Sequence, residues 1–226
     1  MYPKGPIRPV VIILGPPGSG KSLQADLVAE ALDLVHFDAG RYLERLLSEN
    51  RLGSKRKEEF KRGLLVDPRW FLNLVKREIK KINSLGFGVA LAGSLRTSFE
   101  TFGDKKIVGL VPYLAKLYGQ ENIFIFRLNV LPSVSLKRNS QRLVCQVCHL
   151  APINPKKMKV CPRCGGKLVK RHVDDPRIIK IRLEEYKERS EPVVEELKKK
   201  GVEVIEVDGQ KKPVQVFEAI MKYLKT

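Results

Sequence analysis

Acidic residues, aromatic residues and long apolar runs are all scarce in this sequence. Asp and Glu number 25 against 43 Lys and Arg, so the formal net charge is +18 at pH 7. This excess favours polyanionic partners, a class that includes nucleotides, nucleic acids and acidic membranes. No apolar stretch approaches the roughly 20 residues that a membrane-spanning helix needs, and residues 1–9 show no signal-peptide pattern. We therefore expect a soluble, cytoplasmic monomer with no membrane partner.

Cysteine is absent except in one short segment. The four cysteines form two C-x-x-C pairs with twelve residues between them, Cys145, Cys148, Cys161 and Cys164. Each pair places two thiolates on one tight turn, and two such turns complete a tetrahedral zinc site. Two disulfides are the alternative, but they need an oxidising compartment, which nothing else in the sequence indicates. The spacing predicts a structural zinc ion, with the neighbouring His149 as a bystander.

Acidic residues are also absent from the whole region around these cysteines. Between Asn122 and Val173 every charged residue is Lys or Arg. A segment with charges of one sign repels itself unless an anion or metal-bound thiolates compensate it; general basicity is the alternative explanation. Residues 141–173 contain no Phe, Tyr or Trp on which bases could stack. Nucleic acid is therefore the less favoured polyanionic partner.

The clearest motif lies near the N-terminus. An apolar run, residues 10–14, leads into Gly15-Pro-Pro-Gly-Ser-Gly-Lys-Ser22, and a helical pattern follows. The turn matches G-x-x-x-x-G-K-[ST], the phosphate-binding loop. In such a loop, backbone N–H groups surround the phosphates, the lysine reaches the outer phosphates and the serine hydroxyl ligates magnesium. The predicted ligands of the ATP phosphates and magnesium are Gly15, Gly18, Ser19, Gly20, Lys21 and Ser22.

Short apolar segments alternate with helical patterns along the rest of the chain. This alternation predicts an α/β fold with a parallel five-stranded sheet covered by helices. The expected strands are 10–14, 34–37, 88–92, 123–128 and 202–207. The expected helices are 21–32, 41–49, 55–62, 68–84, 111–118, 132–141, 176–200 and 213–224. The Glu191-Pro192 step should kink or divide the helix at 176–200.

Two segments interrupt the predicted phosphate-binding core, which comprises residues 1–38, 68–140 and 174–226. One is the helical insert at residues 39–67, and the other is the cysteine module at residues 141–173. Two inserts beside one phosphate loop suggest two facing sites, each able to close.

Five motifs resemble the adenylate kinase family in order and spacing, over nearly the whole chain. They are the phosphate loop, Gly93-Ser-Leu-Arg-Thr97, Arg138-x-x-x-Arg142, the basic-to-acidic segment 170–183, and Val207-Asp-Gly209. The cysteine module is similar to the zinc-containing lid of the long bacterial-type enzymes. The resemblance implies reversible transfer of the terminal phosphoryl group of ATP to AMP, a nucleoside monophosphate that the helical insert would bind.

The resemblance also implies functions for single residues. Lys21 would follow the transferred group, Arg96 would hold the acceptor phosphate, and Asp174 would orient the arginines around it. Those arginines are Arg138, Arg142, Arg171 and Arg182. Such a cluster stabilises dispersed negative charge where water is excluded. Arg171 is out of register with the family, because His172 and Val173 separate it from the aspartate pair.

The sequence departs from the family pattern in the segments expected to bind the acceptor. The family's Thr-Gly-Asp reads Ala39-Gly40-Arg41 here, and Glu44 replaces an arginine four residues after the glycine. Ala92 replaces the aspartate of Asp-Gly-Phe-Pro-Arg, so both aspartates that lie near the magnesium waters are missing. The predicted contacts to the acceptor nucleotide are Gly40, Arg41, Arg45, Arg96 and Glu100.

Glu100 occupies a position where the family commonly has glutamine. A carboxylate only accepts hydrogen bonds, so it would suit the N1–H and N2 amine of guanine better than adenine. Guanine or relaxed acceptor specificity is therefore one alternative to transfer onto AMP. A nucleotide-binding relative with weak transfer is a second, because the aspartates are missing. A zinc-ribbon ATPase that binds nucleic acid is the third.

Overall fold

The computed structural model describes residues 8–153 and 158–224. Its centre is a parallel five-stranded sheet with strand order β2-β3-β1-β4-β7. The strands are β1 (Val10–Leu14), β2 (Val35–Asp38), β3 (Val89–Ala92), β4 (Ile123–Asn129) and β7 (Ile205–Asp208). β1 and β3 are buried along their whole length, as expected for inner strands of a sheet covered on both faces. The predicted α/β fold is confirmed.

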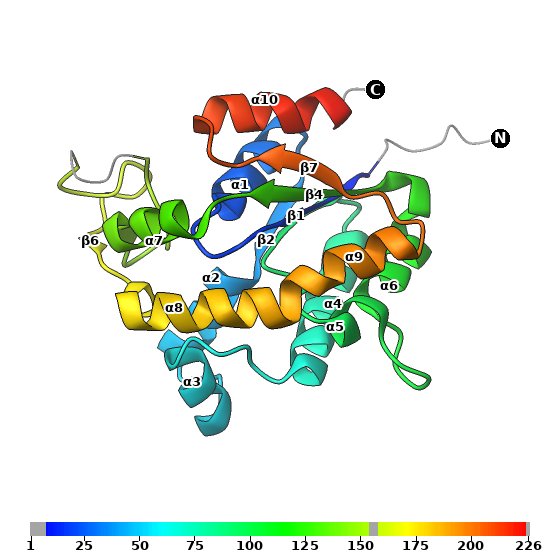
Figure 1. The fold of residues 1–226 in the computed structure, drawn as a ribbon, viewed down its shortest axis with the longest axis horizontal. Coiled ribbons are helices and arrows are strands. Elements are labelled where there is room, and N and C mark those ends of the chain that lie inside the picture. The colour runs from blue at the N-terminus through cyan, green and yellow to red at the C-terminus, as the bar shows by residue number, and fades with distance from the viewer. Residues whose placement is uncertain (1–7, 154–157, 225–226) are drawn as a thin grey trace.

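Helices cover the two faces of the sheet in separate groups (Figure 1). On one face, α1 (Lys21–Ala31) and α10 (Pro213–Leu224) pack against alternate strand residues such as Ile13 and Phe126. On the other face lie α4 (Pro68–Ser84), α6 (Leu110–Tyr118) and α9 (Glu191–Lys199). The remaining helices are α2 (Ala39–Ser48), α3 (Ser54–Lys61), α5 (Ser98–Phe102), α7 (Pro132–Gln141) and α8 (Pro176–Glu185).

Helix α4 illustrates how the sequence sets these elements. The Asp67 side chain caps it by accepting a hydrogen bond from the Trp70 N–H at 2.7 Å, and Pro68 occupies the first turn. Its buried residues recur every three or four positions, as a helix with one buried face requires: Phe71, Leu72, Leu74, Val75, Ile79 and Ile82.

Several local features differ from the prediction. β2 ends on Asp38 rather than Phe37, and β7 begins at Ile205 rather than residue 202. The short helix α5 was not predicted, although Thr97 caps it by accepting from the Glu100 N–H. The expected long helix is divided by a π-helical turn, Tyr186–Ser190, just before Glu191, as the Glu191-Pro192 step predicted.

The two segments predicted as inserts lie at the same end of the sheet (Figure 1). Helices α2 and α3 make up most of the helical insert, and Leu43 and Leu46 of α2 belong to the core around the sheet. The cysteine module holds a small antiparallel pair, β5 (Val144–Cys145) and β6 (Leu168–Val169). Within the described residues, no helix combines the length and apolarity that membrane crossing demands.

Candidate active site

The phosphate-binding loop connects β1 to α1 and needs its glycines. Gly18 and Gly20 have φ angles of 79° and 94°, in the left-handed region that favours glycine. A Cβ on Gly18 would also lie 2.5 Å from the Asn139 side chain and 2.9 Å from the Ser135 carbonyl, because α7 packs directly on the loop. Helix α1 begins at Lys21, so its N-terminus faces the same loop. This geometry suits a bound phosphate chain.

Lys21 is partly buried among positive charges. Its ammonium donates a hydrogen bond to the Pro16 carbonyl at 3.1 Å. Burial lowers the pKa of Lys21 to about 7, and the charges of Arg182, Arg142 and Arg171 contribute to the shift. Burial and the neighbouring Arg171 and Arg142 likewise lower the pKa of Arg182 to about 9. A bound phosphate chain would relieve the mutual repulsion of these groups.

Asp174 holds two of the predicted arginines together. Its carboxylate accepts two hydrogen bonds from Arg142, at 2.8 and 2.5 Å, and lies 3.5 Å from Arg182. The Asp174 side chain is only 3% exposed. Arg182 also donates to the Val173 carbonyl. The structure therefore brings these three residues into one cluster beside Lys21.

The other two predicted arginines are held separately. Arg138 donates to the backbone carbonyl of Gly209 at 2.8 Å and to that of Gln210. Arg171 pairs with Glu44 of α2, and its Nε donates to Glu44 at 2.6 Å. This ion pair joins the cysteine module to the helical insert. Glu44, which replaces the family's acceptor arginine, thus partners an arginine instead of a phosphate in this structure.

Two adjoining cavities surround the phosphate loop. The first lies between the loop, the helical insert and the Gly93–Arg96 turn, and the cysteine module contributes His149 and Arg171. The second is lined by Arg138 and by the Gly209–Pro213 region on the other side of the loop. Both cavities share one set of lining residues, namely Gly18, Lys21, Ser22, Arg41, Arg142 and Ala151. Two ligands could therefore meet end to end at Lys21.

The predicted phosphate-loop residues divide between these cavities. Gly15 lines the first, Ser19 and Gly20 line the second, and Gly18, Lys21 and Ser22 line both. Asp174 lines neither cavity and reaches them only through Arg142 and Arg182.

The Arg96–Glu100 pair differs from what the acceptor prediction required. Arg96 lines the first cavity, and its guanidinium packs 3.4 Å from the centre of the Phe71 ring. Its Nε and a terminal N–H group donate to the two carboxylate oxygens of Glu100, at 3.3 and 2.9 Å. Glu100 is 1% exposed and lines neither cavity. The Glu100 carboxylate therefore orients Arg96, and the geometry gives no support to a contact with a base.

Arg41 and Arg45, predicted as alternative phosphate ligands, have different surroundings. Gly40 lines the first cavity, and Arg41 lines both. The Arg41 guanidinium donates to both oxygens of Asp26, at 3.1 and 2.5 Å. Arg45 lies 3.9 Å from Glu49 and over the Tyr42 ring, and it lines neither cavity. Of the two, only Arg41 is placed to meet a ligand.

Sequence reasoning missed Asp38 as a site residue. It ends β2, lines the first cavity beside Lys21 and Ser22, and has an 8% exposed side chain. Burial alone would raise the pKa of Asp38, but the Arg41 charge and a hydrogen bond from Ser22 outweigh burial and lower it. The available signal was a lone carboxylate at the end of a predicted strand that runs toward the phosphate loop.

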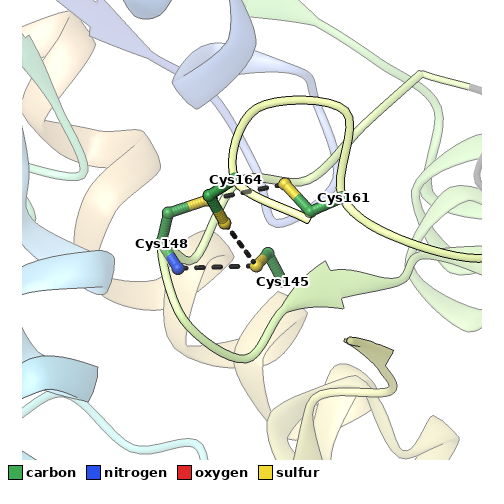
Figure 2. A group of neighbouring side chains, drawn as sticks. All are labelled: Cys145, Cys148, Cys161 and Cys164. Atoms are coloured by element: carbon green, nitrogen blue, oxygen red, sulfur yellow. Dashed lines mark hydrogen bonds between the residues drawn. The ribbon is translucent and has the colours of Figure 1, made fainter. Parts of the chain in front are cut away.

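The four cysteines converge in the cysteine module (Figure 2). Their sulfur atoms all lie within 4.8 Å of one another, and none forms a disulfide. The Cys145–Cys164 and Cys148–Cys161 sulfur pairs are separated by 3.4 and 3.6 Å. Tetrahedral zinc with bonds of about 2.3 Å needs sulfurs about 3.8 Å apart. The donor set therefore fits zinc, and His149 lies outside it.

Comparison with known proteins agrees with this site. Residues 14–105 match a family model described as an AAA domain. The adenylate kinase of Caldicellulosiruptor saccharolyticus is 32% identical over 95% of this chain and 98% of its own length. The adenylate kinase of Clostridium tetani is also 32% identical, over 95% of this chain and 97% of its own length. That of Methanocella arvoryzae is 32% identical over 88% of this chain and 91% of its own length. This chain belongs to the adenylate kinase family of nucleoside monophosphate kinases.

Proposed function

We propose that this protein transfers the terminal phosphoryl group of ATP to AMP reversibly, giving two molecules of ADP. The observation that carries the proposal is the wall shared by the two cavities, which contains Lys21, Arg41 and Arg142. Direct transfer needs donor and acceptor phosphates to meet in line, and catalysis then consists of positioning and charge stabilisation. Family membership supports the same reaction.

The second cavity is the proposed donor site. It adjoins the phosphate loop, and Arg138 with the Gly209–Pro213 region would surround the nucleoside of ATP. The first cavity is the proposed acceptor site, with apolar walls for the base such as Leu64 and Leu65. Arg96, held by Glu100, would contact the acceptor phosphate through its remaining N–H groups.

The proposed catalytic residues act on the transferred group from several sides. Lys21, Arg142, Arg171 and Arg182 would stabilise its spreading negative charge, and Asp174 would keep Arg142 and Arg182 in place. The cysteine module lines both cavities, through Ala151 among others. Closure of that module would exclude water, which protects ATP from hydrolysis.

Two metal ions belong to the proposal. The four cysteine thiolates would hold one zinc ion, which cross-links the turns of a module with little core of its own. The Ser22 hydroxyl would ligate magnesium, which supplies charge neutralisation on the ATP phosphates.

The boundaries of the two inserts, the monomeric state and the cytoplasmic location stay predictions.

The alternatives are less well supported. Guanine specificity depended on a free Glu100 carboxylate, and both its oxygens are bonded to Arg96. A zinc-ribbon ATPase acting on nucleic acid is not favoured, because the similarity to adenylate kinases covers 95% of the chain, cysteine module included.

Product formation tests the proposal. Purified protein is incubated with ATP, magnesium and each nucleoside monophosphate in turn, and nucleotides are separated by chromatography. We expect ADP from AMP at a higher kcat/KM than diphosphates from GMP, CMP or UMP. Arg142→Ala should abolish most of this activity, since it removes a charge from the shared wall. Absence of turnover with every acceptor would refute the proposal, and preferred use of GMP would refute its acceptor.

A further inference from the structure

One carboxylate in the phosphate site has no counterpart among the kinase motifs. Asp38 is nearly buried, and it faces the cavity that Lys21 and Ser22 also line. The negative charge of Asp38 raises the pKa of Lys21, opposing the arginines, so the two groups interact electrostatically. The Ser22 hydroxyl donates a hydrogen bond to Asp38. A serine and a carboxylate therefore meet at the first turn of α1.

The position of Asp38 in the sheet suggests why it is there. In the parallel register of β2 and β3, Asp38 lies directly opposite Ala92. Ala92 occupies the place where the family has an aspartate near the magnesium waters, and Arg41 occupies the place of the second such aspartate. Residues opposite each other in a sheet share a face. The carboxylate missing from β3 is thus present one strand away, on the same face.

We propose that Ser22 and Asp38 together hold the magnesium ion that accompanies ATP, with Asp38 substituting for the aspartates that Ala92 and Arg41 have replaced. This inference rests on the proposed kinase function. The donor set suits the ion, because magnesium prefers hard oxygen ligands and is bound by one or two carboxylates together with substrate phosphates. Ser22 occupies the position after the lysine, where phosphate-loop proteins place their magnesium ligand.

A purely structural function for Asp38 makes a different prediction. Its carboxylate caps α2 by accepting from the Arg41 N–H at 3.0 Å. Asparagine caps helices about as well as aspartate, so Asp38→Asn keeps the cap and removes the charge. Asp26→Asn is a matched control, because Asp26 is also a part-buried carboxylate bonded to Arg41 but lines neither cavity.

The test measures how magnesium changes nucleotide affinity. A nonhydrolysable ATP analogue is titrated calorimetrically into wild type, Asp38→Asn and Asp26→Asn, with magnesium and in magnesium-free buffer without a chelator, which spares the zinc. We expect magnesium to tighten binding to the wild type. In Asp38→Asn this gain should shrink about 10- to 100-fold, while affinity without magnesium changes little. Asp26→Asn should keep the wild-type gain.

Each other outcome has a definite meaning. An unchanged magnesium-dependent gain in Asp38→Asn overturns the inference, and so does an equal loss in Asp26→Asn, which would show a general effect through Arg41. The product assay on the wild type tests the kinase proposal independently of the function given to Asp38. ADP formation by the wild type together with an unchanged gain in Asp38→Asn removes only the function given to Asp38, whereas no turnover removes the kinase proposal itself.

Discussion

At the scale of single residues, the site is a set of charges that compensate one another. Asp174 neutralises Arg142 and Arg182, Glu44 neutralises Arg171, and Glu100 neutralises Arg96. Lys21 faces several of these cations, and its pKa is lowered first by burial and then by the repulsion that remains. A phosphate chain would supply the missing negative charge.

The lowered pKa of Lys21 predicts a pH-dependent affinity for ATP. With a pKa of about 7 in the free protein, Lys21 is mostly neutral at pH 8, and bound phosphates would restore its proton. Below pH 7, protonation of Lys21 should therefore leave the ATP affinity unchanged. Above pH 7, the ATP affinity should fall about tenfold per pH unit. Calorimetry in buffers of different ionisation enthalpy at pH 8 should detect proton uptake. Binding without proton uptake at that pH would contradict the low pKa.

The buried Arg96–Glu100 pair predicts a loss of stability when its charge is removed. Glu100→Gln leaves the Arg96 guanidinium with a neutral partner in a nearly buried site, which should cost about 3 kcal/mol of unfolding free energy. The AMP-to-GMP preference should stay unchanged, since Glu100 lines neither cavity. Glu58→Gln is the control, because the Glu58–Arg62 pair is exposed and worth at most about 1 kcal/mol. Urea denaturation measures both, and equal stability losses would contradict the account.

Residue types alone made one part of the site, the phosphate loop, predictable from the sequence. The phosphate loop was predictable because its glycines, lysine and serine lie close together in sequence. Phosphate and magnesium binding require each of these residue types at its position. Asp38 was not predicted, and neither was the pairing of Glu100 with Arg96, because these contacts are set by strand register and by the turn at Leu95, whose φ is 56°. The short helix α5 carried a recognisable signal, since Thr97 and Glu100 have capping-box spacing.

At the scale of elements, the inserts meet over the site. Arg171 and His149 of the cysteine module both approach Glu44 of α2, with His149 at 4.0 Å. The π-helical turn between α8 and α9 places Tyr186 and Ser190 on the wall of the first cavity. The helices themselves followed from periodicity, and the Glu191-Pro192 step predicted a break near this turn. The π-helical form of the turn was not predictable, because its sequence also suits an ordinary helix.

The contact between the inserts predicts that Glu44 favours closure. Glu44→Gln removes the charge that holds Arg171, so the cysteine module should open more often. Hydrogen exchange at residues 144–150 of the nucleotide-free protein should become faster. Glu49→Gln, at the C-cap of the same helix but paired with exposed Arg51, should leave that exchange as in the wild type. Unchanged exchange in Glu44→Gln would show that the ion pair does not control closure.

The converging cysteines predict that zinc stabilises the module more than the core. Metal analysis of the purified protein should find one zinc ion per chain. Its removal by a chelator should lower the melting temperature and expose the module to proteolysis, because the turns lose their cross-link. ATP binding should persist, since the phosphate loop is anchored in the sheet. A metal-free protein with an unchanged melting temperature would contradict a structural zinc.

At the scale of the whole molecule, the fold positions two ligands around one loop. The parallel sheet directs the carboxyl ends of β1, β2 and β3 toward the site, where the phosphate loop, Asp38 and the Gly93–Arg96 turn follow. This arrangement was predictable as a class from alternating strands and helices. The shared wall of the two cavities was not, because it combines residues from the core and both inserts.

A structure with a bisubstrate analogue, two adenosines joined by a phosphate chain, tests this account most directly. We predict one nucleoside in each cavity, with the phosphates crossing the shared wall beside Lys21 and contacting Arg142, Arg171 and Arg182. A phosphate chain open to bulk solvent, or arginines that point away from it, would contradict the account.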